Sequence, residues 1–189
     1  HRVAVVDLDL EAPGVGPLLG VRTERGVLDV LVDHIATGRI DLDGASAPSE
    51  IEGDVGRYIR VFSAGNVNDA YVQKLARLDF SSTEPGTDNP VGDALRAMLA
   101  KMKPDFDVIL LDSRAGLHDL AGMSLHGLAH VDVLAFRGTE QSLTGLGQTL
   151  RTLESREDTQ LVLVETLLPA TDEELLNFRR QRTRARVYE

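Results

Sequence analysis

Short apolar runs alternate with amphipathic segments along the chain. The apolar runs predict buried strands at residues 3–8, 58–62, 107–111, 131–136 and 160–164. Apolar residues at helical spacing predict helices at residues 26–36, 69–78, 91–102 and about 139–153, and a last helix opens at residue 171. Residues 11–17, 40–56 and 79–90 are rich in Pro, Gly or polar residues and predict loops. This alternation predicts an α/β fold, a three-layer sandwich with helices on both faces of a mostly parallel sheet.

Composition narrows the class of protein. The chain has 189 residues and 42% hydrophobic content, which suits one domain with a proper core and excludes wholesale disorder. The absence of cysteine excludes disulfides, thiolate metal sites and a cysteine nucleophile. The formal net charge of -10 argues against a surface that coats nucleic acid. Because the sequence has no cysteine and opens on a strand rather than a leader pattern, we expect a cytoplasmic protein.

Two of the predicted strands end in acidic residues. One runs into Asp7 and Asp9, and another runs into Asp112, which is followed by Ser-Arg-Ala-Gly. Ligands of parallel α/β sheets bind at the carboxyl ends of strands, and an apolar strand that ends in Asp has the form of a Walker B element, whose carboxylate positions Mg²⁺. Asp7 and Asp9 would share one side of a continuing strand, where a cation would relieve their repulsion. The open alternative is that each acid caps a turn or is solvated.

These segments resemble the ParA/MinD-type deviant Walker P-loop ATPases. The segments that carry the resemblance are VAVVDLDLEAPGV (switch I and its strand), DVILLDSRAGLHDLAG (Walker B and switch II), VDVLAFRGTEQSLTGL (a later strand and helix) and RVFSAGNVNDAYVQKL (strand, turn and helix). The DLEAPG and DSR-x-G-L stretches are similar to a branch whose P-loop reads KGGVGR. The resemblance implies a P-loop NTPase-like domain over residues 1–178, followed by an Arg-rich tail at 179–189.

The resemblance also implies cofactors and residue roles. ATP and Mg²⁺ would be the cofactors, with Asp112 holding the hydration shell of the ion and Asp7 doing likewise. Asp9 would orient or deprotonate the attacking water. The resemblance thus implies Asp9 and Asp7 as the catalytic residues. The implied nucleotide-binding residues are Pro13, Gly14, Arg114 and Gly116. For Arg114 the favoured alternative is an ion pair with Asp119.

The family's Gly-rich phosphate loop and its lysine would precede the strand that ends at Asp7. The chain starts too late to hold that loop, and Lys74, Lys101 and Lys103 do not follow a Gly-rich turn. We therefore expect the chain to be incomplete at its N-terminus, and we expect ATPase activity to depend on the upstream residues.

The implied function is a Mg-ATP-dependent switch that binds ATP and hydrolyses it slowly. It would dimerise through its nucleotide face and regulate the recruitment or positioning of a protein partner. The main alternative is a non-catalytic relative that serves as an interaction module. A haloacid-dehalogenase-like phosphatase with Asp7 as nucleophile is less favoured, because Glu11 stands where that family has Thr or Val.

Five arginines form a cluster near the end of the chain: Arg179, Arg180, Arg182, Arg184 and Arg186. This cluster could bind nucleic acid or an anionic membrane. The favoured interpretation is that arginines near a helix end offset the helix macrodipole and the net negative charge.

Overall fold

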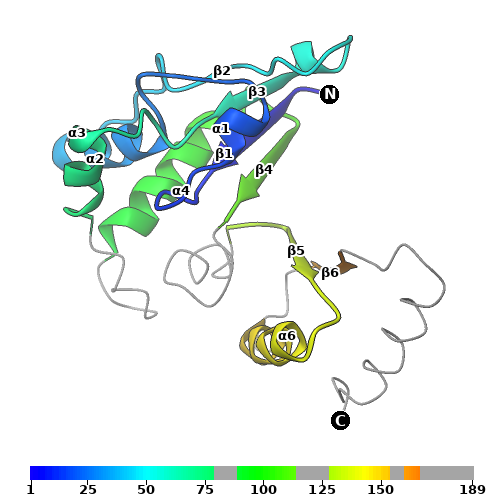
Figure 1. Cartoon of the computed structure of the whole chain (residues 1–189). Helices are drawn as coiled ribbons and strands as arrows, with labels where there is room; N and C mark the ends of the chain where they lie inside the picture. Colours follow the sequence, from blue (N-terminus) through cyan, green and yellow to red (C-terminus); the bar gives the residue numbers. More distant parts are fainter. Residues whose placement is uncertain (79–88, 114–127, 154–159, 167–189) are drawn as a thin grey trace. The chain divides into compact units, whose positions relative to one another are not determined.

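The computed structural model describes residues 1–78, 89–113, 128–153 and 160–166. Contacts divide the chain into two compact units, His1–Ser124 and Leu125–Glu189. The first unit holds a four-stranded sheet of order β2-β3-β1-β4, and the second holds a two-stranded sheet of β5 and β6 (Figure 1). All strand pairs except β2–β3 are parallel. The predicted α/β fold with a mostly parallel sheet is confirmed.

The strands of the first unit are β1 (Val3–Asp7), β2 (Ala47–Pro48), β3 (Ile59–Phe62) and β4 (Val108–Asp112). Those of the second unit are β5 (Val131–Phe136) and β6 (Gln160–Glu165). The helices are α1 (Val15–Leu18), α2 (Val27–Thr37), α3 (Asp69–Leu75), α4 (Pro90–Met102) and α6 (Glu140–Leu153), with a 3-10 turn η1 (Gly56–Tyr58). All five predicted strands and the four predicted helices that fall on described residues are present, with ends that differ by at most three residues.

Burial differs between β1 and β4. β1 lies between two neighbours, and its Ala4, Val6 and Asp7 are fully buried. β4 is an edge strand of the described sheet, and its Val108 and Leu110 remain 43% and 52% exposed. β4 is therefore less buried than its apolar sequence predicts, because burial depends on the neighbours of a strand as well as on its residues.

The helix α1 corrects the prediction of a loop over residues 11–17. One helical turn begins inside this segment because the carboxylate of Asp7 accepts the N–H groups of Gly14 and Val15 at 3.1 and 3.0 Å. Pro17 falls in the first turn, where its missing N–H removes no helical hydrogen bond. A contact from a residue outside the segment thus stabilises a turn that local composition argues against.

Polar side chains cap the starts of three helices. The Asn68 side chain accepts the Tyr71 N–H at 3.0 Å, and the Asn89 side chain accepts the Gly92 N–H at 2.8 Å. At the start of α6, the Thr139 side chain accepts the N–H of Ser142 at 3.4 Å. No helix in the described part of the chain has the length and apolar character needed to cross a bilayer.

The helices α2 and α4 supply most of the helical core. Their buried apolar residues are Val27, Leu28, Val30 and Leu31 of α2 and Val91, Ala94, Leu95, Met98, Leu99 and Met102 of α4. Ile35, an apolar residue of α2, is 42% exposed. It lies in the last turn of α2, just before Gly38 ends the helix in the left-handed conformation at φ 71°.

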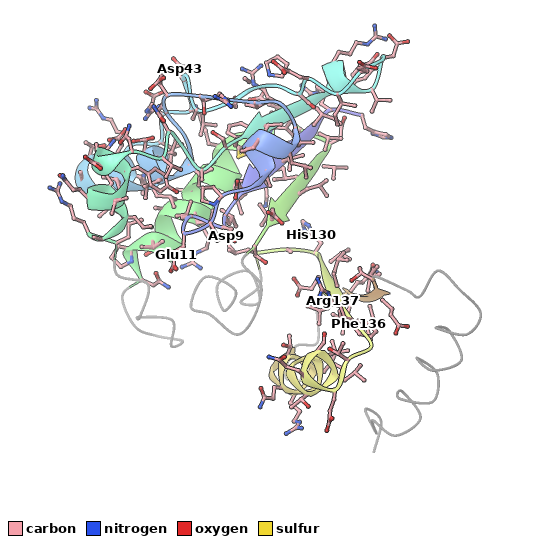
Figure 2. The ribbon with its side chains drawn as sticks, viewed as in Figure 1. Asp9, Glu11, Asp43, His130, Phe136 and Arg137 are labelled. Carbon is pink, nitrogen blue, oxygen red and sulfur yellow. The ribbon has the colours of Figure 1, made fainter. Side chains whose placement is uncertain are left out.

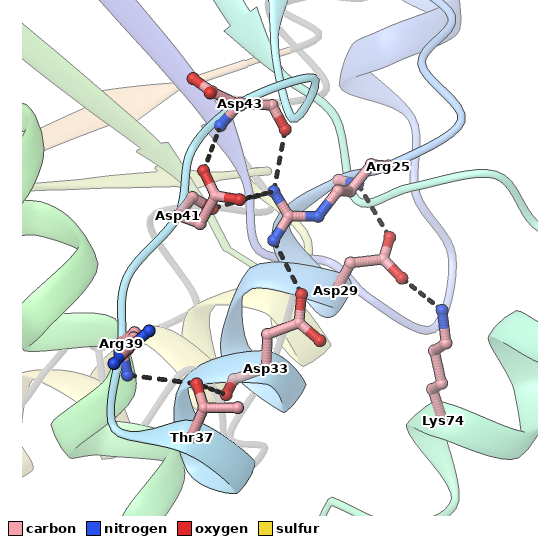
Figure 3. A network of polar contacts seen from close by, with 9 residues as sticks. Arg25, Asp29, Asp33, Thr37, Arg39, Asp41, Asp43 and Lys74 are labelled. Atoms are coloured by element: carbon pink, nitrogen blue, oxygen red, sulfur yellow. Dashed lines mark hydrogen bonds and ion pairs between the residues drawn. The ribbon is translucent and has the colours of Figure 1, made fainter.

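Arg25 fixes the loop that follows α2 (Figure 3). Its guanidinium donates hydrogen bonds to the backbone carbonyls of Asp41 and Asp43 at 3.0 and 2.8 Å. It also donates to the Asp33 carboxylate on α2 at 2.7 Å. One side chain therefore connects the loop to the middle of the helix, with the multiple donors that a guanidinium offers.

Candidate functional site

The candidate site lies where β1 and β4 end. Asp7 and Asp112 are register partners on these two parallel strands, and the Leu8 N–H donates to the Asp112 carbonyl at 2.8 Å. Asp9 follows on the loop after β1, and Figure 2 labels it together with Glu11. The structure therefore brings the three aspartates singled out from the sequence to one edge of the sheet.

Asp7 is fully buried, and both oxygens of its carboxylate accept hydrogen bonds from backbone N–H groups. Its Oδ1 accepts the Asp9 N–H at 3.2 Å, and its Oδ2 accepts the N–H groups of Gly14 and Val15 at 3.1 and 3.0 Å. The two ends of the loop over residues 8–14 are thus attached to one side chain. Asp7 determines the path of the loop that carries Asp9.

Asp9 and Asp112 are more accessible than Asp7. Asp9 is half-buried, and its Oδ1 accepts the Ala12 N–H at 3.1 Å. Asp112 is exposed at the last position of β4. Of the lysines, arginines and histidines in the described ranges, none forms an ion pair with either carboxylate. These two acids can meet a ligand from solvent.

The electrostatics of the cluster disfavour full ionisation. Burial raises the pKa of Asp7 above its ordinary value, the charge of Asp112 adds to this, and the three N–H donors oppose it. Desolvation raises the pKa of Asp112, and the charge of Asp9 adds to it. A cation at this edge would stabilise the ionised forms.

The acids can supply some of the ligands of Mg²⁺ but not a complete binding site. In the described ranges, no group of three or more His, Asp or Glu side chains could hold a metal ion by itself. Asp9 and Asp112 offer hard oxygen donors, and Mg²⁺ often takes one or two carboxylates while waters and phosphate oxygens complete its shell. The site therefore suits an ion that arrives with a phosphate ligand, and does not form a closed protein cage.

The other residues implied by the resemblance are only partly described. Pro13 is half-buried and Gly14 is exposed, and Gly14 contributes its N–H to Asp7. Arg114, Gly116 and the arginines at 179–186 lie outside the described residues.

Two residues near the site take roles that the sequence pattern did not indicate. The hydroxyl of Tyr71, a buried residue of α3, donates to the Leu10 carbonyl at 2.7 Å. Lys74, also on α3, pairs with Asp29 of α2 at 2.5 Å (Figure 3). The helical spacing shows only that Tyr71 faces inward, although a buried tyrosine hydroxyl normally requires a partner.

Comparison with known proteins gives matches by structure alone. No protein-family model and no curated protein sequence matches the chain. Cobyrinic acid a,c-diamide synthase from Mycobacterium smegmatis, solved with an ATP analog and magnesium, is 23% identical with a TM-score of 0.64, over 100% of this chain and 70% of that one. The cell division ATPase MinD from Pyrococcus furiosus is 20% identical with a TM-score of 0.64, over 95% and 67% of the two chains.

A plasmid partition protein from Borrelia burgdorferi matches with the same TM-score at a lower sequence identity. It is 12% identical with a TM-score of 0.64, over 95% of this chain and 71% of that one. At such identities the matches establish the fold. The predicted α/β fold with a mostly parallel sheet is therefore confirmed, and it is the fold of these solved proteins.

Proposed function

We propose that this chain carries the acidic switch region of a cytoplasmic, Mg-ATP-dependent nucleotide switch of the ParA/MinD type. The switch would bind and slowly hydrolyse ATP and would regulate the recruitment or positioning of a protein partner. The observation that carries the proposal is the register pairing of Asp7 with Asp112 at the carboxyl ends of β1 and β4, with Asp9 on the adjoining loop. Ligands of parallel α/β sheets bind at this edge. The ATP analog and magnesium of one similar structure, and the ATPase activity of another, support the same interpretation.

Each acid has a distinct role in this proposal. Asp112 would hold water ligands of Mg²⁺, and Asp9 would orient or deprotonate the attacking water. Asp7 would act mainly through the loop, because its oxygens already accept three backbone N–H groups. Bound Mg²⁺ would neutralise charge on the phosphate oxygens.

The proposal also needs a loop that cradles the phosphates. Lys74 is not a candidate for that loop, since it lies on α3 and pairs with Asp29. We place the phosphate loop before β1 in the full-length protein. Pro13, Gly14, Arg114 and Gly116 would line the nucleotide, and two copies would dimerise through the nucleotide face.

ATP turnover by the full-length protein tests the role of Asp9. We expect Asp9→Asn to lower kcat by about 100-fold or more, because the water loses its general base, while the affinity for Mg-ATP changes by less than about threefold. Asp105→Asn is the matched control. Asp105 is exposed and precedes the start of β4, so it lies away from the carboxyl ends of β1 and β4. Turnover by Asp9→Asn at the wild-type rate would refute the assigned role.

The same experiment separates the alternatives. A folded full-length protein that binds Mg-ATP weakly or without turnover would be a non-catalytic interaction module. A phosphatase with Asp7 as nucleophile is disfavoured, because that carboxylate is fully buried and both of its oxygens accept backbone N–H groups. A phosphoaspartate trapped at Asp7 would reverse this judgement.

A further inference from the structure

A hydrogen bond from α3 reaches the backbone of the acidic loop. The Tyr71 hydroxyl donates to the Leu10 carbonyl at 2.7 Å, and both residues are buried. Leu10 directly follows Asp9, so this bond holds the loop one residue beyond the carboxylate. On the other side of that carboxylate, the Asp9 N–H is held by Asp7 at 3.2 Å. Asp9 is therefore fixed from both sides, by two side chains that come from different elements.

Tyr71 is itself held firmly in place. The N-cap Asn68 accepts its backbone N–H at 3.0 Å. Its ring packs on Gly65, where an added Cβ would lie 3.3 Å from the ring edge. One turn further along α3, Lys74 pairs with Asp29 at 2.5 Å, and Asp29 also accepts the Gly26 N–H at 2.9 Å. These contacts connect the start of α2 to α3 and keep Tyr71 in a fixed position.

The surroundings of Tyr71 keep its hydroxyl a donor. Burial raises the pKa of the phenol, and the negative charges of Asp7, Asp29 and Asp9 raise it further. The hydroxyl therefore keeps its proton throughout the neutral range and can donate to the Leu10 carbonyl.

We propose that Tyr71 is a positioning residue, which holds the Leu10 carbonyl so that the Asp9 carboxylate stays beside Asp112. The proposal rests on the proposed function for its catalytic consequence, but the loop contact itself does not. Without the hydroxyl, the buried Leu10 carbonyl loses its partner, and the loop loses one of the contacts that hold it beside Asp9. A looser loop would spread Asp9 over positions that do not serve the metal-bound phosphate.

Two measurements on full-length Tyr71→Phe test the proposal. The first is amide hydrogen exchange of residues 9–15, which does not depend on nucleotide. We expect exchange about fivefold faster than in the wild type, which corresponds to the loss of one hydrogen bond. Tyr58→Phe is the control, because Tyr58 is 47% exposed, and its exchange in this loop should not change.

The second measurement is the steady-state kinetics of ATP turnover. We expect Tyr71→Phe to lower kcat about fivefold, with the KM for Mg-ATP changed by less than about twofold, as expected for a change that acts through Asp9. A merely structural role would lower the amount of folded protein and leave the kcat of the folded fraction unaltered. Exchange at the wild-type rate in Tyr71→Phe would overturn the positioning proposal even if ATP is hydrolysed. Faster exchange in a protein that shows no Mg-ATP binding would uphold the loop contact and refute the proposed function.

Discussion

Replacing Gly26 by alanine should separate α2 from the loop between β3 and α3. The added Cβ would lie 2.5 Å from the Ala64 carbonyl carbon and from the Gly65 Cα, and would also contact the Gly65 nitrogen. These are backbone atoms, which cannot rotate away as the end of a flexible side chain can. The start of α2 must therefore move. The chain between the acidic loop (residues 8–14) and α2 would move with it at its C-terminal end.

The magnitude follows from the hydrogen bonds that join the two segments. The N–H of Val27 donates to the Ser63 carbonyl at 2.8 Å, and that of Leu28 donates to the Ala64 carbonyl at 3.1 Å. Val27 and Leu28 are fully buried, so neither N–H gains a water molecule when its bond breaks. A buried, unpaired N–H costs about 1–3 kcal/mol. We expect Gly26→Ala to lower the free energy of unfolding by about 2–4 kcal/mol.

Urea unfolding followed by far-UV circular dichroism measures this loss. Gly14→Ala is the matched control, because an added Cβ there meets nothing within 4 Å and the φ of -130° suits any residue. Its free energy of unfolding should change by about 0.5 kcal/mol or less. A Gly26→Ala protein within about 0.5 kcal/mol of the wild type would refute the steric reasoning.

Two further predictions concern charged side chains. Lys74→Met breaks the 2.5 Å pair with Asp29, whose side chain is only 14% exposed, and should cost about 1–3 kcal/mol of unfolding free energy. Arg96→Met breaks an exposed pair with Asp93 and should cost about 0.5 kcal/mol or less. Equal urea midpoints for these two variants would contradict the assigned burial. Asp112 and Asp7 both have pKa values raised above 3.8 in the folded protein. The folded state therefore binds more protons than the unfolded state, and stability falls as pH rises from about 3.8 through the raised pKa values. In metal-free buffer, Asp112→Asn should reduce this fall and raise the urea midpoint at pH 7, and a lower midpoint would show that the repulsion is not present.

The sequence predicts the elements of the fold because each has a strong local signal. Apolar runs mark the strands, and apolar residues at helical spacing mark the helices. The meeting of Asp7 with Asp112 also follows, since both end parallel strands and the carboxyl ends of such strands share one edge. The register itself, which makes them direct partners, is not encoded in either segment.

Other features depend on contacts between distant segments, which local patterns do not show. The helix α1 forms because Asp7 caps it, and the Asp7 side chain is a buried acceptor of three N–H groups, which its sequence context does not show. The bond from Tyr71 to Leu10 joins residues 61 positions apart. Helical spacing could place Tyr71 on an inner face but could not identify the carbonyl that receives its hydroxyl.

Calorimetric titration of ATP into the full-length protein, with Mg²⁺ or with EDTA, tests most directly whether the acids of β1 and β4 serve one metal-bound nucleotide. In the wild type we predict that Mg²⁺ tightens ATP binding by about tenfold or more. In Asp112→Asn most of that gain should disappear, while the affinity in EDTA should be unchanged. An equal Mg²⁺-dependent gain in both proteins, or no heat from a folded wild type, would contradict the account.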